Sequence, residues 1–366
     1  MTNHTAEKLQ ALRSRMVQNH VDLIAIGPGA QMKWLLGFYP MPDERPCLLL
    51  IGADGESFVM PAMNAEGSRQ HTEIAFRTWD DADGADAALA AALGDVEATD
   101  AKSVVIDEAM RADFALLVLD AIPGAKHSFT EATLGALRMR KNEDEYLELK
   151  MNAGLADEAM QTAFAAVQPG MREAELAEVI SESFASNSAR PLFCIVGAGP
   201  NGAYPHHHTG DTAIKTGDAI VVDIGARRGT FSSDITRMIV VGDPPEGYEA
   251  VHGVVEAAVE AALKIARPGI IAREVDAAAR NVIAEAGYGE YFVHRTGHGL
   301  GVEGHEPPYI TSTSEVVLDA GMVFSIEPGI YLPGRFGIRL EEIVILRENG
   351  PEILSGLSRD FYHARV

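Results

Sequence analysis

The first hundred-odd residues alternate between helical and extended hydrophobic patterns. Apolar side chains recur at helical spacing over residues 6–18, which predicts an amphipathic helix. Short, continuous apolar runs follow, each of a length typical of a buried strand. These runs cover residues 21–26, 46–51, 57–60 and 103–106. The alternation of helix and strand predicts an α/β domain.

A different pattern begins after a polar helix start at residues 138–145. Two alanine-rich helical stretches flank Pro169-Gly170, and two more flank Pro268-Gly269. In both cases a glutamate follows the glycine after five residues, although two Pro-Gly helix starts can also resemble one another by chance. Two helices and an acid-bearing hairpin thus occur twice, which predicts a pseudo-twofold α+β shell.

Acidic residues interrupt the strand-like runs of this second region. Asp223 ends an apolar run, and Asp234 begins the next one. If Arg228-Gly229 form the centre of the turn, Asp223 faces Asp234 across a hairpin. Facing carboxylates repel one another unless a cation lies between them.

A second hairpin repeats this construction. A loop centred on Pro333-Gly334 would place Glu327 opposite Glu341. His298 lies between two glycines that permit close backbone approach. Each acid taken alone is expected in an exposed position, but four carboxylates and one imidazole together suit a pair of divalent ions such as Mn, Co or Zn. Two cysteines, Cys47 and Cys194, cannot supply a thiolate cluster.

These residues and their surroundings resemble the pita-bread metallopeptidases, the family of Xaa-Pro aminopeptidases, prolidases, methionine aminopeptidases and creatinase. The resemblance covers about residues 140–366 and rests on five motifs: Val-Asp-Ile-Gly, Ser-Asp-Ile-Thr-Arg, Gly-His-Gly-Leu-Gly, Ser-Ile-Glu-Pro-Gly-Ile-Tyr and Ile-Arg-Leu-Glu. It implies two divalent ions per chain, manganese being the first choice. Asp234 and Glu341 would bridge them, Asp223 would complete one ion, and His298 with Glu327 would complete the other.

The same resemblance assigns roles to residues around the metals. His206 would contact the substrate near the scissile bond, His305 would donate to the oxyanion, and His294 would support the site. Glu327 would relay a proton, and Arg339 would bind substrate. The plainer interpretation of His206, shared with its neighbours in the sequence, is an exposed polar loop, and that of His294 is a buried supporting histidine.

The N-terminal half resembles the creatinase-type domain that accompanies aminopeptidases and prolidases. The resemblance rests on the segment Trp34-Leu35-Leu36-Gly37-Phe38 and on Arg45. It implies a homodimer in which Arg45 reaches a substrate carboxylate in the neighbouring subunit, whereas a surface arginine is the simpler alternative. We predict a creatinase-type domain at residues 1–135 and a pita-bread catalytic domain at residues 136–366.

Composition limits the number of domains, the cellular location and the partners that can be expected. A chain of 366 residues is long enough for two cores. Two cysteines and the absence of a signal-peptide pattern predict a cytoplasmic protein. The formal net charge of −23 argues against nucleic acid or an anionic membrane as a partner.

We therefore expect a dinuclear metal-dependent hydrolase that cleaves small peptides with proline at the second position. Aminopeptidase is placed ahead of dipeptidase, because some microbial prolidases carry an arginine where this chain has Tyr309. Two alternatives stay open. One is an enzyme acting on a small solute, such as an ectoine-type amide or a sulfonium osmolyte, and the other is a metal-free peptide-binding module.

Overall fold

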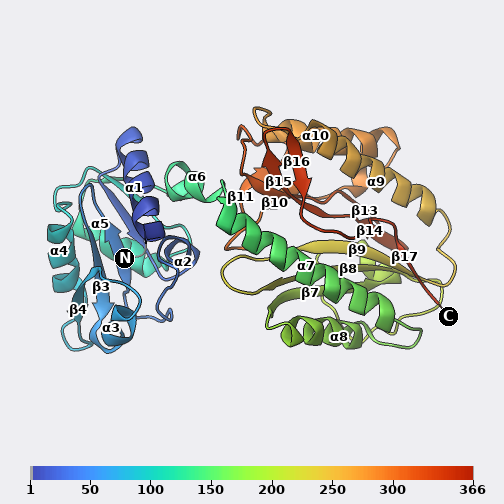
Figure 1. Cartoon of the computed structure of the whole chain (residues 1–366), viewed down its shortest axis with the longest axis horizontal. Coiled ribbons are helices and arrows are strands. Elements are labelled where there is room, and N and C mark those ends of the chain that lie inside the picture. Colours follow the sequence, from blue (N-terminus) through green and yellow to red (C-terminus); the bar gives the residue numbers. More distant parts are fainter. Residues whose placement is uncertain (1–2, 366) are drawn as a thin grey trace. The chain divides into compact units, whose positions relative to one another are not determined.

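A computed structural model describes residues 3–365 of the chain. It divides into two compact units that meet between Arg138 and Met139, and each is described by itself (Figure 1). The predicted domain boundary after residue 135 stays a prediction. None of the helices between residues 3 and 365 combines the length and apolar character that a membrane-spanning segment needs.

The N-terminal unit is an α/β domain built on one six-stranded sheet, as its hydrophobic pattern predicts. The strand order is β4-β3-β2-β1-β5-β6, with antiparallel pairing in the middle and parallel pairing toward both edges. The four predicted strands are the four central ones. The two edge strands, β4 and β6, were not predicted because none of their residues is fully buried, so they lack the apolar run that marks a buried strand. Its elements are α1 (Asn3–Gln18), β1 (Leu23–Ile26), α2 (Ala30–Leu36), β2 (Leu48–Ile51), β3 (Glu56–Pro61), α3 (Ala62–Arg69), β4 (Ala75–Trp79), α4 (Asp86–Asp95), β5 (Ser103–Ile106), α5 (Ala112–Ala121), β6 (Lys126–Ser128), η1 (Thr130–Ala132) and α6 (Leu134–Arg138).

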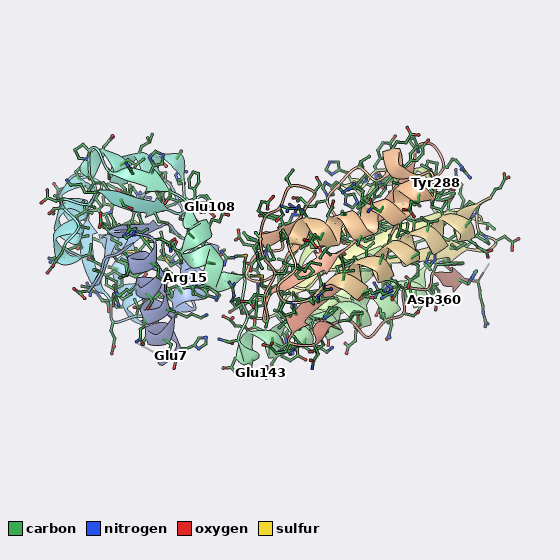
Figure 2. All side chains as sticks on the ribbon, turned by 90° about the horizontal axis from the view of Figure 1, so that it is seen from above. Glu7, Arg15, Glu108, Glu143, Tyr288 and Asp360 are labelled. Atoms are coloured by element: carbon green, nitrogen blue, oxygen red, sulfur yellow. The ribbon has the colours of Figure 1, made fainter. Side chains whose placement is uncertain are left out.

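The C-terminal unit packs helices against largely antiparallel sheets, in which β17 pairs with β9 in parallel. Its four-stranded sheet has the order β17-β9-β8-β7, and its five-stranded sheet has the order β11-β10-β12-β15-β16. The α9 and α10 helices lie side by side, with Tyr288 just beyond the end of α10 (Figure 2). Its elements are α7 (Glu143–Ala166), α8 (Glu173–Ser186), β7 (Arg190–Ala198), η2 (Gly199–Ala203), β8 (Ala219–Arg227), β9 (Ile235–Val241), α9 (Tyr248–Ile265), α10 (Ala272–Glu285), η3 (Gly289–Tyr291), β10 (Gly297–Gly299), β11 (Glu306–Ile310), β12 (Val323–Ile326), β13 (Gly329–Leu332), β14 (Phe336–Arg339), β15 (Glu342–Arg347), β16 (Gly350–Ile353) and β17 (Tyr362–Ala364).

The predicted internal repeat is present in the backbone. Gly170, between α7 and α8, has a φ of +88°, and Gly269, between α9 and α10, has a φ of +90°. The Gly170 amide donates to the Ile214 carbonyl at 2.8 Å, and the Gly269 amide donates to the Leu318 carbonyl at 2.8 Å. Each helix pair is therefore tied in the same way to a later segment of the chain, as the predicted repeat requires.

The register of the first acidic hairpin differs from the prediction. Asp223 on β8 faces Thr236 on β9 instead of Asp234. The loop is longer than a two-residue turn because α7 holds its backbone: the Asn152 side chain donates to the Phe231 carbonyl at 3.2 Å and accepts from the Arg228 amide at 2.8 Å. Since side chains alternate along a strand, a shift of two residues keeps both acids on one face.

The register of the second hairpin agrees with the prediction. Ile326 pairs with Glu342 at the end of the β12–β15 ladder, and Gly329 pairs with Arg339 where the β13–β14 ladder begins. Glu327 and Glu341 occupy the facing positions between these two ladders.

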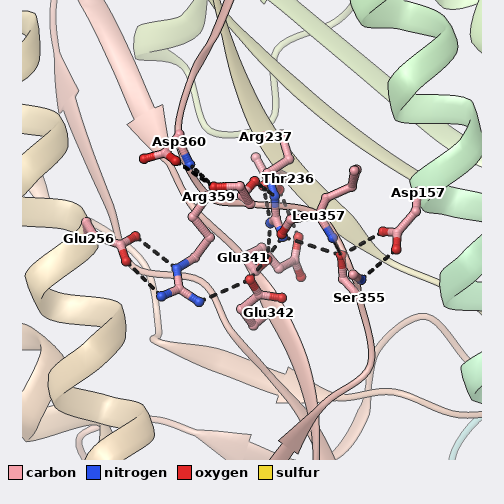
Figure 3. Close-up of polar contacts among 12 residues, drawn as sticks. Asp157, Thr236, Arg237, Glu256, Glu341, Glu342, Ser355, Leu357, Arg359 and Asp360 are labelled. Atoms are coloured by element: carbon pink, nitrogen blue, oxygen red, sulfur yellow. Dashed lines mark hydrogen bonds and ion pairs between the residues drawn. The ribbon is translucent and has the colours of Figure 1, made fainter.

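Buried ion pairs attach the C-terminal segment to the strands that carry the acids (Figure 3). The fully buried Arg237 donates to Glu342 Oε1 at 2.9 Å and to the Ser358 carbonyl at 2.9 Å. Arg359 bridges Glu342, at 3.2 Å, to Glu256 on α9, at 2.7 Å. Glu342 is therefore a buried structural residue.

This network predicts a large effect of Arg237 on stability. Arg237→Leu should lower the free energy of unfolding by about 3–5 kcal/mol, because Glu342 keeps its buried charge and loses its main partner. Urea unfolding of the metal-free variant, followed by circular dichroism, measures this loss. The matched control is Arg273→Leu, which removes an exposed pair with Glu315 and should cost far less. A loss no larger than that of the control would contradict the assignment.

Candidate metal centre

The C-terminal unit contains a cavity of about 570 Å³ lined mainly by polar residues. Every residue that the sequence nominated in this half of the chain lines it. The lining residues are Phe193, Ile195, Pro205, His206, Asp223, Asp234, His294, Arg295, His298, His305, Glu327, Arg339 and Glu341.

Four carboxylates converge on this cavity from the two hairpins. One group of ligand atoms, all within 4.8 Å of one another, comes from Asp223, Asp234 and Glu341. A second group with the same limit comes from His298, Glu327 and Glu341. Glu341 belongs to both groups, so the arrangement has two adjoining positions that share one carboxylate.

The backbone around His298 is fixed by close contacts that only glycine permits. A Cβ atom on Gly297 would lie 1.8 Å from the Ser325 carbonyl oxygen, and one on Gly299 would lie 2.3 Å from that of Pro307. The prediction that these glycines allow close approach is confirmed, and the segment is a short strand, β10, whose pairing with β11 is irregular. The His298 amide donates to Ser325 Oγ at 2.9 Å, and that hydroxyl donates to Glu327 Oε1 at 3.0 Å. This chain of contacts positions two of the candidate ligands together.

The pKa shifts and the unpaired oxygen atoms of the acids favour binding of cations. Burial, reinforced by neighbouring carboxylates, raises the pKa of Asp234 and of Glu341 well above the ordinary range. Burial also acts to raise the pKa of Glu327, but the hydrogen bond and charge of His298 outweigh it and lower that pKa. Asp223 Oδ1 and Glu341 Oε1 are buried and have no hydrogen-bond partner among residues 3–365. Buried acceptors without donors are costly unless a cation binds them, so this donor set fits hard divalent ions.

Arg339 enters the same cavity but is engaged by protein groups. Its guanidinium contacts Asp223 Oδ2 at 2.6 Å, the Tyr331 hydroxyl at 2.8 Å and Thr236 Oγ1 at 3.2 Å. Thr236 in turn donates to Glu341 Oε2 at 2.8 Å. The sequence nominated Arg339 as a substrate contact. In this structure its neighbours are the candidate ligands and the residues that hold them.

The predicted histidines lie around the carboxylates. The His305 ring centroid is 3.9 Å from that of His298, and burial, followed by the charges of His298 and Arg295, lowers the pKa of His305 to about 4. His294 Nε2 contacts the Tyr331 hydroxyl at 2.8 Å. His206 lines the cavity from an exposed position.

Arg45 lies in the N-terminal unit. Its Nε donates to Asp81 Oδ1 at 2.9 Å, and its Nη1 contacts Asp43 and Glu44. Its guanidinium is therefore already surrounded by acids of its own unit.

The sequence missed three residues that shape the cavity. Thr236 could have been found, because it follows Asp234 by two positions and thus shares its face. Arg295 and Tyr331 carry no periodic signal, since their contacts come from segments distant in the sequence. Arg295 contacts His305, and Tyr331 links His294 to Arg339.

Two family descriptions match this chain. The model of metallopeptidase family M24 matches residues 148–348, and that of the creatinase/prolidase N-terminal domain matches residues 8–140. The two matches fall on the two halves that the sequence assigned to these domain types.

Individual relatives agree with these matches. The chain is 39% identical to a probable dipeptidase PepE of Mycobacterium tuberculosis over 89% of this chain and 88% of that protein. It is 31% identical to an Xaa-Pro dipeptidase of Pyrococcus horikoshii over 97% of this chain and 98% of that protein.

Solved structures show the same architecture. Dipeptidase PepE from Mycobacterium ulcerans superposes with a TM-score of 0.94 at 34% identity, covering 99% of this chain and 98% of that one. X-Pro aminopeptidase from Thermotoga maritima superposes with a TM-score of 0.81 at 30% identity, covering 96% and 99%. With its creatinase-type N-terminal domain and its pita-bread C-terminal unit, this chain belongs to metallopeptidase family M24.

Proposed function

We propose that the protein is a dinuclear metal-dependent peptidase that cleaves Xaa-Pro bonds, with Xaa-Pro dipeptides as its preferred substrates. The observation that carries the proposal is the convergence of four carboxylates and His298 on two adjoining positions that share Glu341. The names of relatives support the choice of substrate, since several of them are dipeptidases or Xaa-Pro dipeptidases. The tertiary amide before proline has no N–H and a rigid ring, so its cleavage calls for a specialised site.

The metal ligands follow from the two groups of converging atoms. Asp223, Asp234 and Glu341 would hold one ion, and His298, Glu327 and Glu341 would hold the other. Asp234 also converges with His298 and His305 in a third group, which supports the role of a second shared ligand that the resemblance implies for it. When bound, two divalent ions lower the pKa of a water between them and polarise the carbonyl that it attacks. Manganese is our first choice, with cobalt or zinc as alternatives, because oxygen ligands and a single imidazole suit these ions.

Glu327 is suited to move the proton of the attacking water to the departing nitrogen. Its Oε1 accepts from Ser325 Oγ at 3.0 Å and lies 3.2 Å from His298 Nε2, so its carboxylate is held in one orientation. We assign the proton relay to this residue.

His305 is suited to donate a hydrogen bond to the oxygen of the attacked carbonyl. Arg295 Nη2 lies 3.2 Å from His305 Nδ1. A guanidinium can only donate, so Nδ1 accepts and the proton of the neutral ring is on Nε2. That tautomer leaves a donor for the developing oxyanion. His206 and His294 complete the proposed site as a substrate contact and a supporting residue.

Xaa-Pro aminopeptidase, the first choice from the sequence, is the second candidate. Tyr309 in place of an arginine and the likeness to an X-Pro aminopeptidase favour it. A solute hydrolase has no specific support beyond the breadth of the resemblance.

A homodimer and a cytoplasmic location are also part of the proposal. Both cysteines are free thiols, as a reducing compartment requires. The role proposed for Arg45 needs a second subunit, and there a substrate carboxylate would compete with Asp81, Asp43 and Glu44 for its guanidinium.

The metal assignment predicts stoichiometry and stability together. Purified protein loaded with manganese should contain about two ions per chain, and chelation should abolish hydrolysis and lower the melting temperature, because the acids then repel one another. Asp234→Asn should lose metal, whereas the exposed control Asp54→Asn should keep it. Metal-free protein with undiminished turnover would contradict the proposed mechanism.

Glu327 and His305 have different assigned roles, so substitutions at the two positions should differ in their effects on metal content and turnover. Glu327→Asp should impair both metal binding and turnover, because the shorter side chain withdraws the carboxylate. His305→Ala should lower kcat by about a hundredfold or more with metal content retained, because one oxyanion donor is lost. The matched control is His208→Ala, an exposed histidine outside the cavity. Near-normal turnover in His305→Ala would remove that residue from the site.

A substrate panel tests the proposed function directly. The manganese-loaded enzyme should cleave Xaa-Pro dipeptides with a higher kcat/KM than Xaa-Pro-Xaa tripeptides, and it should leave ectoine, creatine and sulfonium solutes intact. Faster cleavage of tripeptides would favour the aminopeptidase. Cleavage of a solute without peptide cleavage would refute the peptidase assignment.

A further inference from the structure

Two arginines line the cavity, and they differ in how many of their hydrogen-bond donors are already used by other protein groups. Arg339 is 3% exposed. Its donors go to Asp223, to the Tyr331 hydroxyl, to Thr236 and to the Pro205 carbonyl. It has little capacity left for a substrate, so the other arginine is the candidate cation for binding one.

That second arginine, Arg295, is partly exposed and lacks an acidic partner among residues 3–365. Its Nη2 approaches His305 Nδ1 at 3.2 Å, which uses one of its five N–H donors. Its guanidinium carbon lies 4.6 Å from the centroid of the Tyr309 ring. Cation–π stacking of this kind holds the guanidinium plane and leaves its edge free to donate.

The backbone that carries Arg295 is held on both sides. Arg280 donates to the His294 carbonyl at 2.9 Å and to the Phe292 carbonyl at 3.2 Å. Asp276 accepts from the Thr296 amide at 3.1 Å and pairs with Arg280 at 2.9 Å. An arginine on a fixed base loses little freedom when it binds a ligand, so each hydrogen bond contributes more to affinity.

The cavity has negative charges at the candidate metal positions and a positive charge at Arg295, an arrangement that suits a short peptide. Its carboxylates are the candidate metal ligands, and Arg295 is the one cation among the lining residues with no carboxylate partner. The carboxylate of a dipeptide lies on the residue directly after the scissile bond, close to the groups that act on that bond. His305, the proposed oxyanion donor, is in contact with Arg295. A planar guanidinium is the side chain that binds a carboxylate with two parallel hydrogen bonds.

We infer that Arg295 binds the free C-terminal carboxylate of the substrate, with Tyr309 as its stacking support, and so selects dipeptides over longer peptides. The inference rests on the proposed Xaa-Pro peptidase function and deepens it. Arg295 supplies from its own chain the cation whose absence at position 309 first favoured an aminopeptidase. This role differs from that proposed for Arg45, which would act from a second subunit.

The test compares two substrates that differ only in the charge to be recognised. Met-Pro and its C-terminal carboxamide are assayed with full-length, manganese-loaded enzyme. The variants are Arg295→Ala, Arg295→Lys and Arg45→Ala, and the control is Arg267→Ala, an exposed arginine outside the cavity. The measured quantity is the ratio of kcat/KM for the acid to kcat/KM for the amide.

The wild type should favour the acid by about tenfold to a hundredfold, the range expected for hydrogen bonds to a charged group. Arg295→Ala should bring this ratio near one, mainly through a higher KM for the acid, and Arg295→Lys should retain part of the preference. Arg267→Ala should keep it, and Arg45→Ala should lower it less than Arg295→Ala does.

Three results would overturn the inference. One is equal loss on acid and amide in Arg295→Ala, which would mean that the residue acts through His305 alone. The second is a wild-type ratio near one, and the third is a ratio that collapses only in Arg45→Ala. Wild-type enzyme that cleaves neither substrate would remove the proposed function and this inference with it, whereas the three results above leave the peptidase function standing.

Discussion

Mutual repulsion among four carboxylates, two of them buried and two partly buried, is the interaction on which the rest of this structure depends. Asp223, Asp234, Glu327 and Glu341 are brought together by two hairpins, and burial, reinforced by the charges of the neighbouring acids, raises the pKa of Asp234 and of Glu341. Such a cluster contributes nothing to stability by itself. The cluster persists because the surrounding strands and their contacts hold the four acids in place, and because bound divalent ions would offset the repulsion.

The strands that carry the acids use both of their faces. Thr236 and Glu341 lie on the cavity side, and the next residues, Arg237 and Glu342, form the buried ion pair on the other side. Alternation along a strand therefore couples each ligand to an anchor one residue away. Arg237 extends this support to residues 355–358, so the end of the chain helps to fix the site although it contributes none of the ligands (Figure 3).

Features that depend on neighbouring residues could be predicted from the sequence. Features that depend on contacts between distant segments could not. Apolar runs locate the four central strands of the N-terminal sheet, and the spacing of Pro-Gly pairs reveals the internal repeat, because both signals are local. The register at Asp223 was wrong by two residues, since Asn152 on a distant helix sets the loop length. The partner of Glu342 and the contacts of Arg295 could not be predicted, because they join segments with no shared pattern in the sequence.

The converging acids are proposed to form a binding site for two cations. Anomalous diffraction at the manganese edge, from crystals of the manganese-loaded protein, tests this proposal most directly. Two peaks are expected in each chain, one among Asp223, Asp234 and Glu341 and the other among His298, Glu327 and Glu341. A cavity without anomalous density, or a single peak away from these carboxylates, would contradict the proposal.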